Sequence, residues 1–244
     1  ALFRSPWYVL GIAVAMGSWG LHVAALALAP ISLVQSTIAG CLVFLTVIAD
    51  RVFGHQVTRR EWMGVALPAI GLAFLAATLS GAGDEAHSDY GAGTLAGYVG
   101  LVTVAGLVLV PFARGAGRDG ALLAASAGLL WGGSDVSIKA LSGSLDERGI
   151  GVLIHPLAFV ILALSLLGLL VSARSLQVGR PVAVIAVTSA TANTITIASG
   201  PIVFGEPMPE EPLGVALRVL AFTLVIAAAA LTPPPAVTSE PARA

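Results

Sequence analysis

Charge and sulfur are both scarce in this chain of 244 residues. Only 10% of the residues are charged, the formal net charge is -1, and the single cysteine is Cys41. One cysteine excludes a disulfide framework within the chain and a thiolate cage for a metal ion. We expect Cys41 to be a small apolar side chain inside the fold. Apart from Arg59-Arg60 the basic residues do not cluster, so no nucleic-acid partner is expected.

Familiar catalytic motifs are also missing. The sequence contains no H-E-x-x-H, no G-x-S-x-G and no Walker A sequence. The usual residues for zinc proteolysis, for hydrolysis by a serine in a nucleophile elbow (G-x-S-x-G) and for ATP-driven transport are therefore missing. We predict that the protein is not an enzyme and carries no cofactor.

Apolar residues, in contrast, are abundant. They make up 57% of the chain, and the mean hydropathy is +0.95. A water-soluble fold could not bury this much apolar surface, so lipid must be the solvent for most of it. The apolar runs are continuous rather than alternating, which predicts helices instead of barrel strands. The expected fold class is an all-α integral membrane protein.

Runs of about 18 to 23 apolar residues predict eight transmembrane helices. Pro30, Pro156 and Pro181 stand at helix starts, where the missing N–H does no harm. We expect the proline-containing end, residues 232–244, to be a disordered cytoplasmic tail. The expected spans are Trp7 to Ala29, Ile31 to Ala49, Trp62 to Leu79, Thr94 to Phe112, Ala121 to Leu141, Gly151 to Ala173, Pro181 to Gly200 and Leu213 to Leu231.

The basic residues predict the orientation of these spans. Nine of the twelve fall in connections on one side, only Arg148 falls on the other, and Lys139 and Arg218 lie inside spans. By the positive-inside rule both termini of this chain face the cytoplasm of a multi-pass protein in the cytoplasmic (plasma) membrane. The nine are Arg4, Arg51, Arg59, Arg60, Arg114, Arg118, Arg174, Arg180 and Arg243.

A weak internal repeat indicates two related halves. Shifting the chain by 151 residues aligns Pro30 with Pro181 and Val52-Phe53-Gly54 with Val203-Phe204-Gly205. The two copies are five expected spans apart, and an odd offset places them in opposite orientations, as in transporters with inverted repeats. We expect a first half at residues 1–112 and a second half at residues 113–231, with four helices each.

Several of these segments resemble a known family. Ala25 to Gln35, Val52-Phe53-Gly54, Arg59 to Trp62 and Phe204-Gly205-Glu206 look like the two halves of the EamA-like drug/metabolite transporter superfamily. The run from Gly133 to Leu141 resembles its NIPA-type branch, which is associated with magnesium transport. The resemblance implies a further span before Trp7, so the first half is expected to be incomplete. His55 departs from the family pattern, which has an acidic residue there.

Ionisable residues inside the spans are the strongest candidates for a site, because they are costly in hydrocarbon. Asp135 and Lys139 are four residues apart, on one face of a helix, with the acid first, which favours an ion pair. The pair would bind a charged or zwitterionic solute, and Asp135 would be the ligand if a cation is carried. The alternative is a neutralised pair that only fixes helix packing.

Polar stripes on other spans supply the remaining candidates. Ser189, Asn193 and Thr196 recur at helical spacing in the seventh span, where hydroxyls either line a cavity or join helices. In the first span His22 lies beside Trp19, and Gln35 follows Pro30 by about one turn; each is equally a packing residue. The predicted substrate-binding residues are Asp135, Lys139, Asn193, Ser189, Thr196, Gln35, His22 and Trp19.

The leading functional hypothesis is a secondary transporter of a small solute or metabolite that works by alternating access. One alternative is a NIPA-like pathway for magnesium or another divalent cation. A second is a membrane scaffold or accessory subunit that transports nothing. The expected partners are a small-molecule or ion substrate and the lipid bilayer, and a homodimer is left open.

Overall fold

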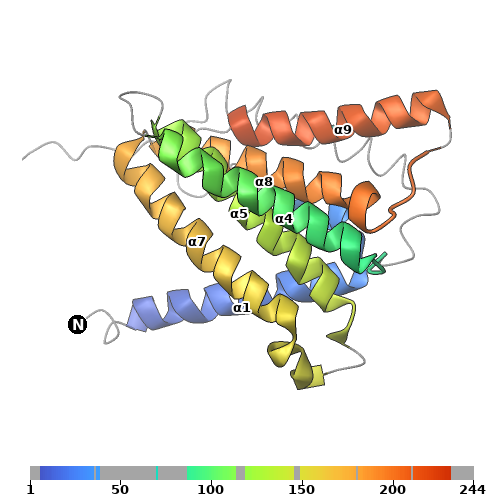
Figure 1. The fold of residues 1–244 in the computed structure, drawn as a ribbon, viewed down its shortest axis with the longest axis horizontal. Coiled ribbons are helices and arrows are strands. Elements are labelled where there is room, and N and C mark those ends of the chain that lie inside the picture. The colour runs from blue at the N-terminus through green and yellow to red at the C-terminus, as the bar shows by residue number, and fades with distance from the viewer. Residues whose placement is uncertain are drawn as a thin grey trace, which may run out of the picture.

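The computed structural model describes residues 6–35, 37–38, 70, 87–113, 119–145, 149–179, 181–209 and 211–231. Within these ranges the chain is helical and contains no strand. The elements are α1 (Pro6–Leu28), α4 (Ala92–Phe112), α5 (Asp119–Ser142), the 3-10 helix η2 (Gly149–Ile154), α7 (Pro156–Val178), α8 (Pro181–Val203) and α9 (Pro212–Leu231) (Figure 1).

Four helices of the described chain are long and apolar enough to cross a membrane. They cover Val9–Leu28, Ala92–Phe112, Asp119–Ser142 and Pro156–Val178. Over the described residues, the prediction of a helical protein with several helices suited to crossing a membrane is confirmed. The third expected span, apart from Ile70, and the second beyond residue 38 lie outside the described residues, as do Cys41 and the first copy of the repeat beyond residue 38. The count of eight spans and the inverted repeat therefore stay predictions.

Helix α5 lies at the centre of the described bundle. It packs against α7, α8, α4 and α1. In its most apolar stretch of 18 residues, 67% of the residues are buried, against 11% in the corresponding stretch of α7. Its glycine, alanine and serine residues explain this position, because small side chains let neighbouring backbones approach closely. A Cβ atom added at Gly128 would come within 2.6 Å of the Thr188 carbonyl oxygen of α8.

Hydroxyl groups join the helices around α5. The Ser126 hydroxyl donates to the Gly106 carbonyl of α4 at 2.7 Å, and the Thr188 hydroxyl donates to the Ala124 carbonyl at 3.2 Å. The Tyr98 hydroxyl of α4 reaches the Ile195 carbonyl of α8 at 2.6 Å. Such bonds satisfy polar groups where water is absent and hold neighbouring helices in register.

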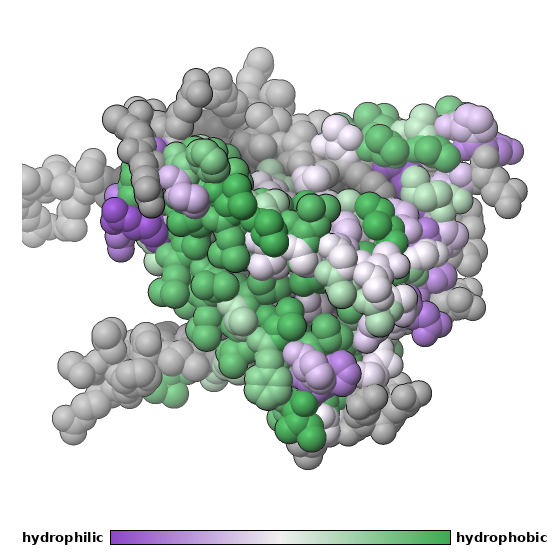
Figure 2. Space-filling view, viewed as in Figure 1, coloured by the Kyte–Doolittle hydropathy of each residue, from purple (hydrophilic) through white to green (hydrophobic). Residues whose placement is uncertain are grey.

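The outer faces of α1, α4 and α7 are apolar. Exposed side chains include Leu21 on α1, Leu101 on α4 and Leu170 on α7, with 75%, 70% and 68% of their surface accessible. Figure 2 shows a broad hydrophobic area over the face to which α4 and α7 contribute. Exposed apolar surface on this scale is expected where helices face lipid chains.

Helix α7 begins later than the sequence predicts. Residues 149–154 form the 3-10 helix η2, and the α-helix starts at Pro156 rather than at Gly151. The side chain of His155 accepts a hydrogen bond from the Leu157 N–H at 3.3 Å, and Pro156 occupies the first helical position. This N-cap and proline fix the start of the helix, whereas hydropathy alone cannot separate η2 from α7.

The end of α8 carries the second copy of the Val-Phe-Gly sequence. Gly205 adopts a positive φ of 61°, and the Glu206 N–H donates to the Gly200 carbonyl at 3.1 Å. The bond closes a turn of seven residues, 200–206, around a left-handed glycine, a conformation that glycine adopts without steric cost. It stops α8 and turns the side chain of Glu206 back toward the bundle.

Candidate functional site

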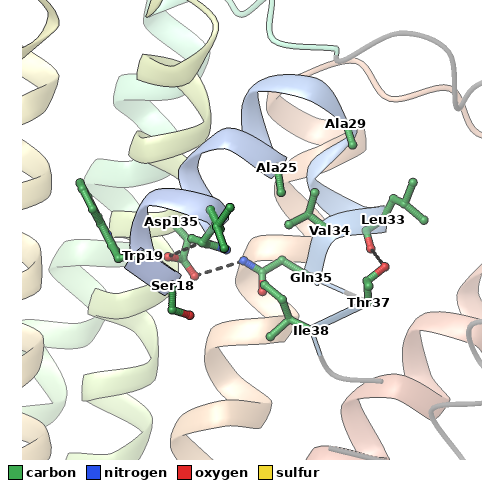
Figure 3. Close-up of a pocket in the computed structure, with 12 residues that line it drawn as sticks. Ser18, Trp19, Ala25, Ala29, Leu33, Val34, Gln35, Thr37, Ile38 and Asp135 are labelled. Atoms are coloured by element: carbon green, nitrogen blue, oxygen red, sulfur yellow. Dashed lines mark hydrogen bonds and ion pairs between the residues drawn. The ribbon is translucent and has the colours of Figure 1, made fainter. Parts of the chain in front are cut away.

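A cavity of about 890 Å³ lies between α1, residues 33–35 and 37–38, and α5. It brings side chains of α1 and of the helix that follows Pro30 together with Asp135 of α5, about a hundred residues later in the sequence (Figure 3). The described lining consists of Ser18, Trp19, Leu21, His22, Ala25, Ala29, Leu33, Val34, Gln35, Thr37, Ile38 and Asp135.

Asp135 is the polar centre of this cavity. The Gln35 side-chain nitrogen donates to Asp135 Oδ2 at 3.2 Å, and His22 Nε2 lies 3.9 Å from Asp135 Oδ1 (Figure 3). A carboxylate only accepts hydrogen bonds, so Gln35 must present its NH₂ group to Asp135 and keeps its carbonyl oxygen for another donor. About a quarter of the Asp135 side chain and a fifth of the His22 side chain stay accessible, at 25% and 19%. A ligand in the cavity can therefore reach both groups.

A break in the helical path brings Gln35 opposite His22. Helix α1 ends at Leu28, Ala29 and Pro30 are not helical, and residues 31–35 are helical again. Pro30 has no N–H to donate and restricts the residue before it, which ends the first helix and starts the second. The chain turns at this point, so the end of α1 and the next helix both face the cavity.

Lys139 caps the carbonyl groups that precede this break. Its ammonium group donates to the Leu26 carbonyl at 2.6 Å and to the Ala29 carbonyl at 2.8 Å, and no part of the residue is exposed. The last carbonyls of a helix lack partners within the helix and carry partial negative charge. A buried cation is a fitting partner for them.

Glu206 holds the amide side of the same break. Its Oε1 accepts a hydrogen bond from the Ser32 N–H at 3.2 Å, at the start of the helix that follows Pro30. The carboxylate lies over Gly200, where an added Cβ atom would come within 2.4 Å of Glu206 Oε2. An acid at a helix N-terminus satisfies free N–H groups and their partial positive charge.

Lys139 and Glu206 belong to one charged cluster. The carboxylate of Glu206 acts electrostatically on Lys139 and on Arg218. Arg218, in α9, is also buried and donates to the Pro207 carbonyl in the connection between α8 and α9. One acid and two cations thus tie α5, α8 and α9 to the break after α1.

The predicted site residues separate into two groups. Trp19, His22, Gln35 and Asp135 all line the cavity, although the sequence placed them on three different segments. Lys139 is buried behind it, with its ammonium group on the backbone of α1. The described lining contains no residue of α8, so Ser189, Asn193 and Thr196 lie elsewhere.

Thr196 has a structural role in the described fold. It is fully buried, and its hydroxyl donates to the Ala192 carbonyl of its own helix at 2.7 Å. The hydroxyl of Thr196 is therefore satisfied within α8 itself. Ser189 and Asn193 are half-buried on α8.

Sequence reasoning missed the capping role of Glu206. In the sequence the residue stands out only as part of Phe204-Gly205-Glu206, which resembles a segment of the EamA-like family. Its position directly after Gly205, shortly beyond the end of an apolar run, was the available signal in the sequence.

The described residues hold no group of three or more histidine, cysteine, aspartate or glutamate side chains that could bind a metal ion together. Asp135 and His22 form only a pair. Comparisons with protein-family models, with curated proteins and with solved structures found no match to this chain.

Proposed function

We propose that the protein is a secondary transporter of a small solute in the cytoplasmic membrane, with the Asp135 cavity as its substrate site. The observation that carries the proposal is this cavity, in which an accessible carboxylate, a histidine and an amide meet among apolar helices. Ionisable groups are expensive at membrane depth and are kept there for a solute or ion pathway.

The depth of the site fits this role. Asp135 lies seven residues before the end of α5 at Ser142, which corresponds to about 10 Å along the helix. His22 lies six residues before the end of α1 at Leu28. Both side chains are therefore well inside segments long enough to cross the hydrocarbon layer.

The assembly of the site from both halves supports alternating access. Trp19, His22 and Gln35 come from the first half, and Asp135 comes from the second. A relative movement of the two halves would separate or close the groups that surround a bound solute, as in transporters built from inverted repeats. The resemblance to EamA-like drug/metabolite transporters, with both termini of this chain in the cytoplasm, is part of the same proposal.

The test is transport by the full-length protein in liposomes. Counterflow of a panel of labelled metabolites and entry of magnesium are measured side by side for wild type, Asp135→Asn and the control Asp89→Asn. Asp89 is exposed before α4, so the control makes the same chemical change outside the cavity.

We expect counterflow with wild type and with the Asp89 control, and its loss with Asp135→Asn. Saturable magnesium entry that depends on Asp135 would refute the metabolite carrier and support the NIPA-like cation pathway. Absence of both activities in correctly folded protein would refute transport and favour the scaffold alternative.

A further inference from the structure

The charge of the cavity limits what it can bind. With histidine counted as neutral, Asp135 is the only charged side chain among the twelve described residues that line the cavity. It is also the only acidic residue within the eight expected spans. The stretches 36–49 and 62–79 contain no aspartate, glutamate, lysine, arginine or histidine. With histidine neutral, the charge of the described lining is therefore a single negative one.

The nearest cation in the sequence does not neutralise the cavity. Lys139 lies one turn beyond Asp135 on α5, but its ammonium group donates to two backbone carbonyls of α1 and is fully buried. Its charge is matched by the carboxylate of Glu206 and by the partial charge at the end of α1. A ligand carboxylate would find no comparable cation among the described lining residues.

The rest of the lining is mostly hydrocarbon. Trp19, Leu33, Val34 and Ile38 contribute apolar side chains around the polar group at Asp135 (Figure 3). Burial of the apolar part of a ligand against this surface favours binding by about 25 cal/mol per Å² of apolar area removed from water. An inorganic ion would leave this surface unused.

Oxygen ligands for a hard divalent cation are few. Calcium takes six to eight oxygen ligands, and magnesium requires a near-octahedral set. Among the described lining residues, only Asp135 offers a carboxylate, and one of its oxygens already accepts from Gln35. An ammonium group needs only two or three acceptors, which the Asp135 carboxylate and the Gln35 carbonyl oxygen can supply.

We propose that the solute bound in this cavity is a small organic monocation, a protonated amine with a hydrocarbon part, and that Asp135 is its counter-ion. The proposal names the substrate class of the transporter proposed above and rests on that function. The ammonium group donates to Asp135 and to the amide oxygen of Gln35. The hydrocarbon part lies against the apolar side chains that Trp19 and Ile38 contribute.

The test compares four ligands that share a phenyl ring and a short chain. Phenethylamine is a cation near neutral pH, 2-phenylethanol is neutral, 3-phenylpropanoate is an anion, and phenylalanine is a zwitterion. Equilibrium dialysis with the full-length protein in detergent measures binding, and liposome counterflow measures transport. Wild type, Asp135→Asn, Asp135→Glu and Asp89→Asn are compared, with size-exclusion profiles as the check on folding.

We expect phenethylamine to bind more tightly than the other three ligands. Asp135→Asn should weaken its binding at least about ten-fold, the equivalent of about 1.4 kcal/mol. Asp135→Glu keeps the charge and should retain the preference for the cation, which separates loss of charge from loss of fold. Asp89→Asn should behave like wild type.

Three results would overturn the proposal: equal or tighter binding of the anion, the zwitterion or the alcohol; unchanged binding of phenethylamine by Asp135→Asn; or binding of none of the four. The two assays separate this inference from the proposed function. Binding that depends on Asp135, without counterflow, would support the ligand class and refute transport. Counterflow of metabolites without a preference for phenethylamine would support transport and refute the proposed ligand class.

Discussion

Replacing Lys139 by methionine should destabilise the fold strongly. Methionine has a similar length but cannot donate to the Leu26 and Ala29 carbonyls, which Lys139 reaches at 2.6 and 2.8 Å. It also leaves the buried carboxylate of Glu206 with one cation fewer. Polar contacts within membranes contribute about 0.6 kcal/mol on average and up to about 1.7 kcal/mol each. Loss of the partner of a buried charge costs about 3–5 kcal/mol.

These contributions overlap, because the same ammonium group makes them. We therefore expect Lys139→Met to lower the free energy of unfolding by about 3 kcal/mol. Glu206→Gln should also destabilise, but the double variant should cost less than the sum of the two. A coupling of at least about 1 kcal/mol is expected, since interacting residues give coupling energies of about 0.5–3 kcal/mol.

The assay is equilibrium unfolding by dodecyl sulfate in mixed micelles, followed by helical circular dichroism and tryptophan fluorescence. Leu101→Ala is the control, because Leu101 lies on the lipid-facing side of α4 with 70% of its surface exposed. Additive effects of the two variants, within about 0.5 kcal/mol, would show that Lys139 and Glu206 act independently. A cost for Lys139→Met no greater than that of the control would refute its capping role.

Two further predictions concern glycines, one at the close approach of two helices and one in a left-handed turn. Gly128→Ala places a Cβ atom 2.6 Å from the Thr188 carbonyl oxygen and should cost about 1–3 kcal/mol through strain between α5 and α8. Gly97→Ala, with no atom within 4 Å of the added Cβ, should be neutral in the same unfolding assay, and equal effects would argue against this close approach. Gly205→Ala, at a φ of 61°, should cost about 1–2 kcal/mol. Gly205→Asn should cost less because asparagine tolerates this conformation, so a reversed order in melting temperature would contradict the turn.

The helices themselves could be predicted from hydropathy, because each depends on a local run of apolar residues. The predicted spans agree with α1, α4, α5, α8 and α9 to within a few residues. Hydropathy alone misplaced the start of α7, since η2 is as apolar as the helix that follows, whereas Pro156 marked the correct start. Capping geometry is decided by single side chains, which an average over many residues hides.

The site was predicted residue by residue but not as a constellation. Asp135 stood out because an ionisable side chain costs free energy in hydrocarbon, and helical spacing suggested His22 and Gln35. Nothing in the local sequence, however, indicates that the Gln35 side-chain nitrogen lies 3.2 Å from the Asp135 carboxylate. The i, i+4 rule predicts that Asp135 and Lys139 share a face. It cannot foresee that Lys139 donates to the backbone of a helix 113 residues earlier in the chain.

The capped break after α1 has a consequence for biosynthesis. Lys139 is synthesised 113 residues after Leu26, and Glu206 is synthesised 174 residues after Ser32. Until those two residues have been synthesised, the carbonyls and amides around Pro30 have neither partner. Segments much later in the chain, α5 and the connection after α8, therefore complete the joint between α1 and the helix that follows Pro30.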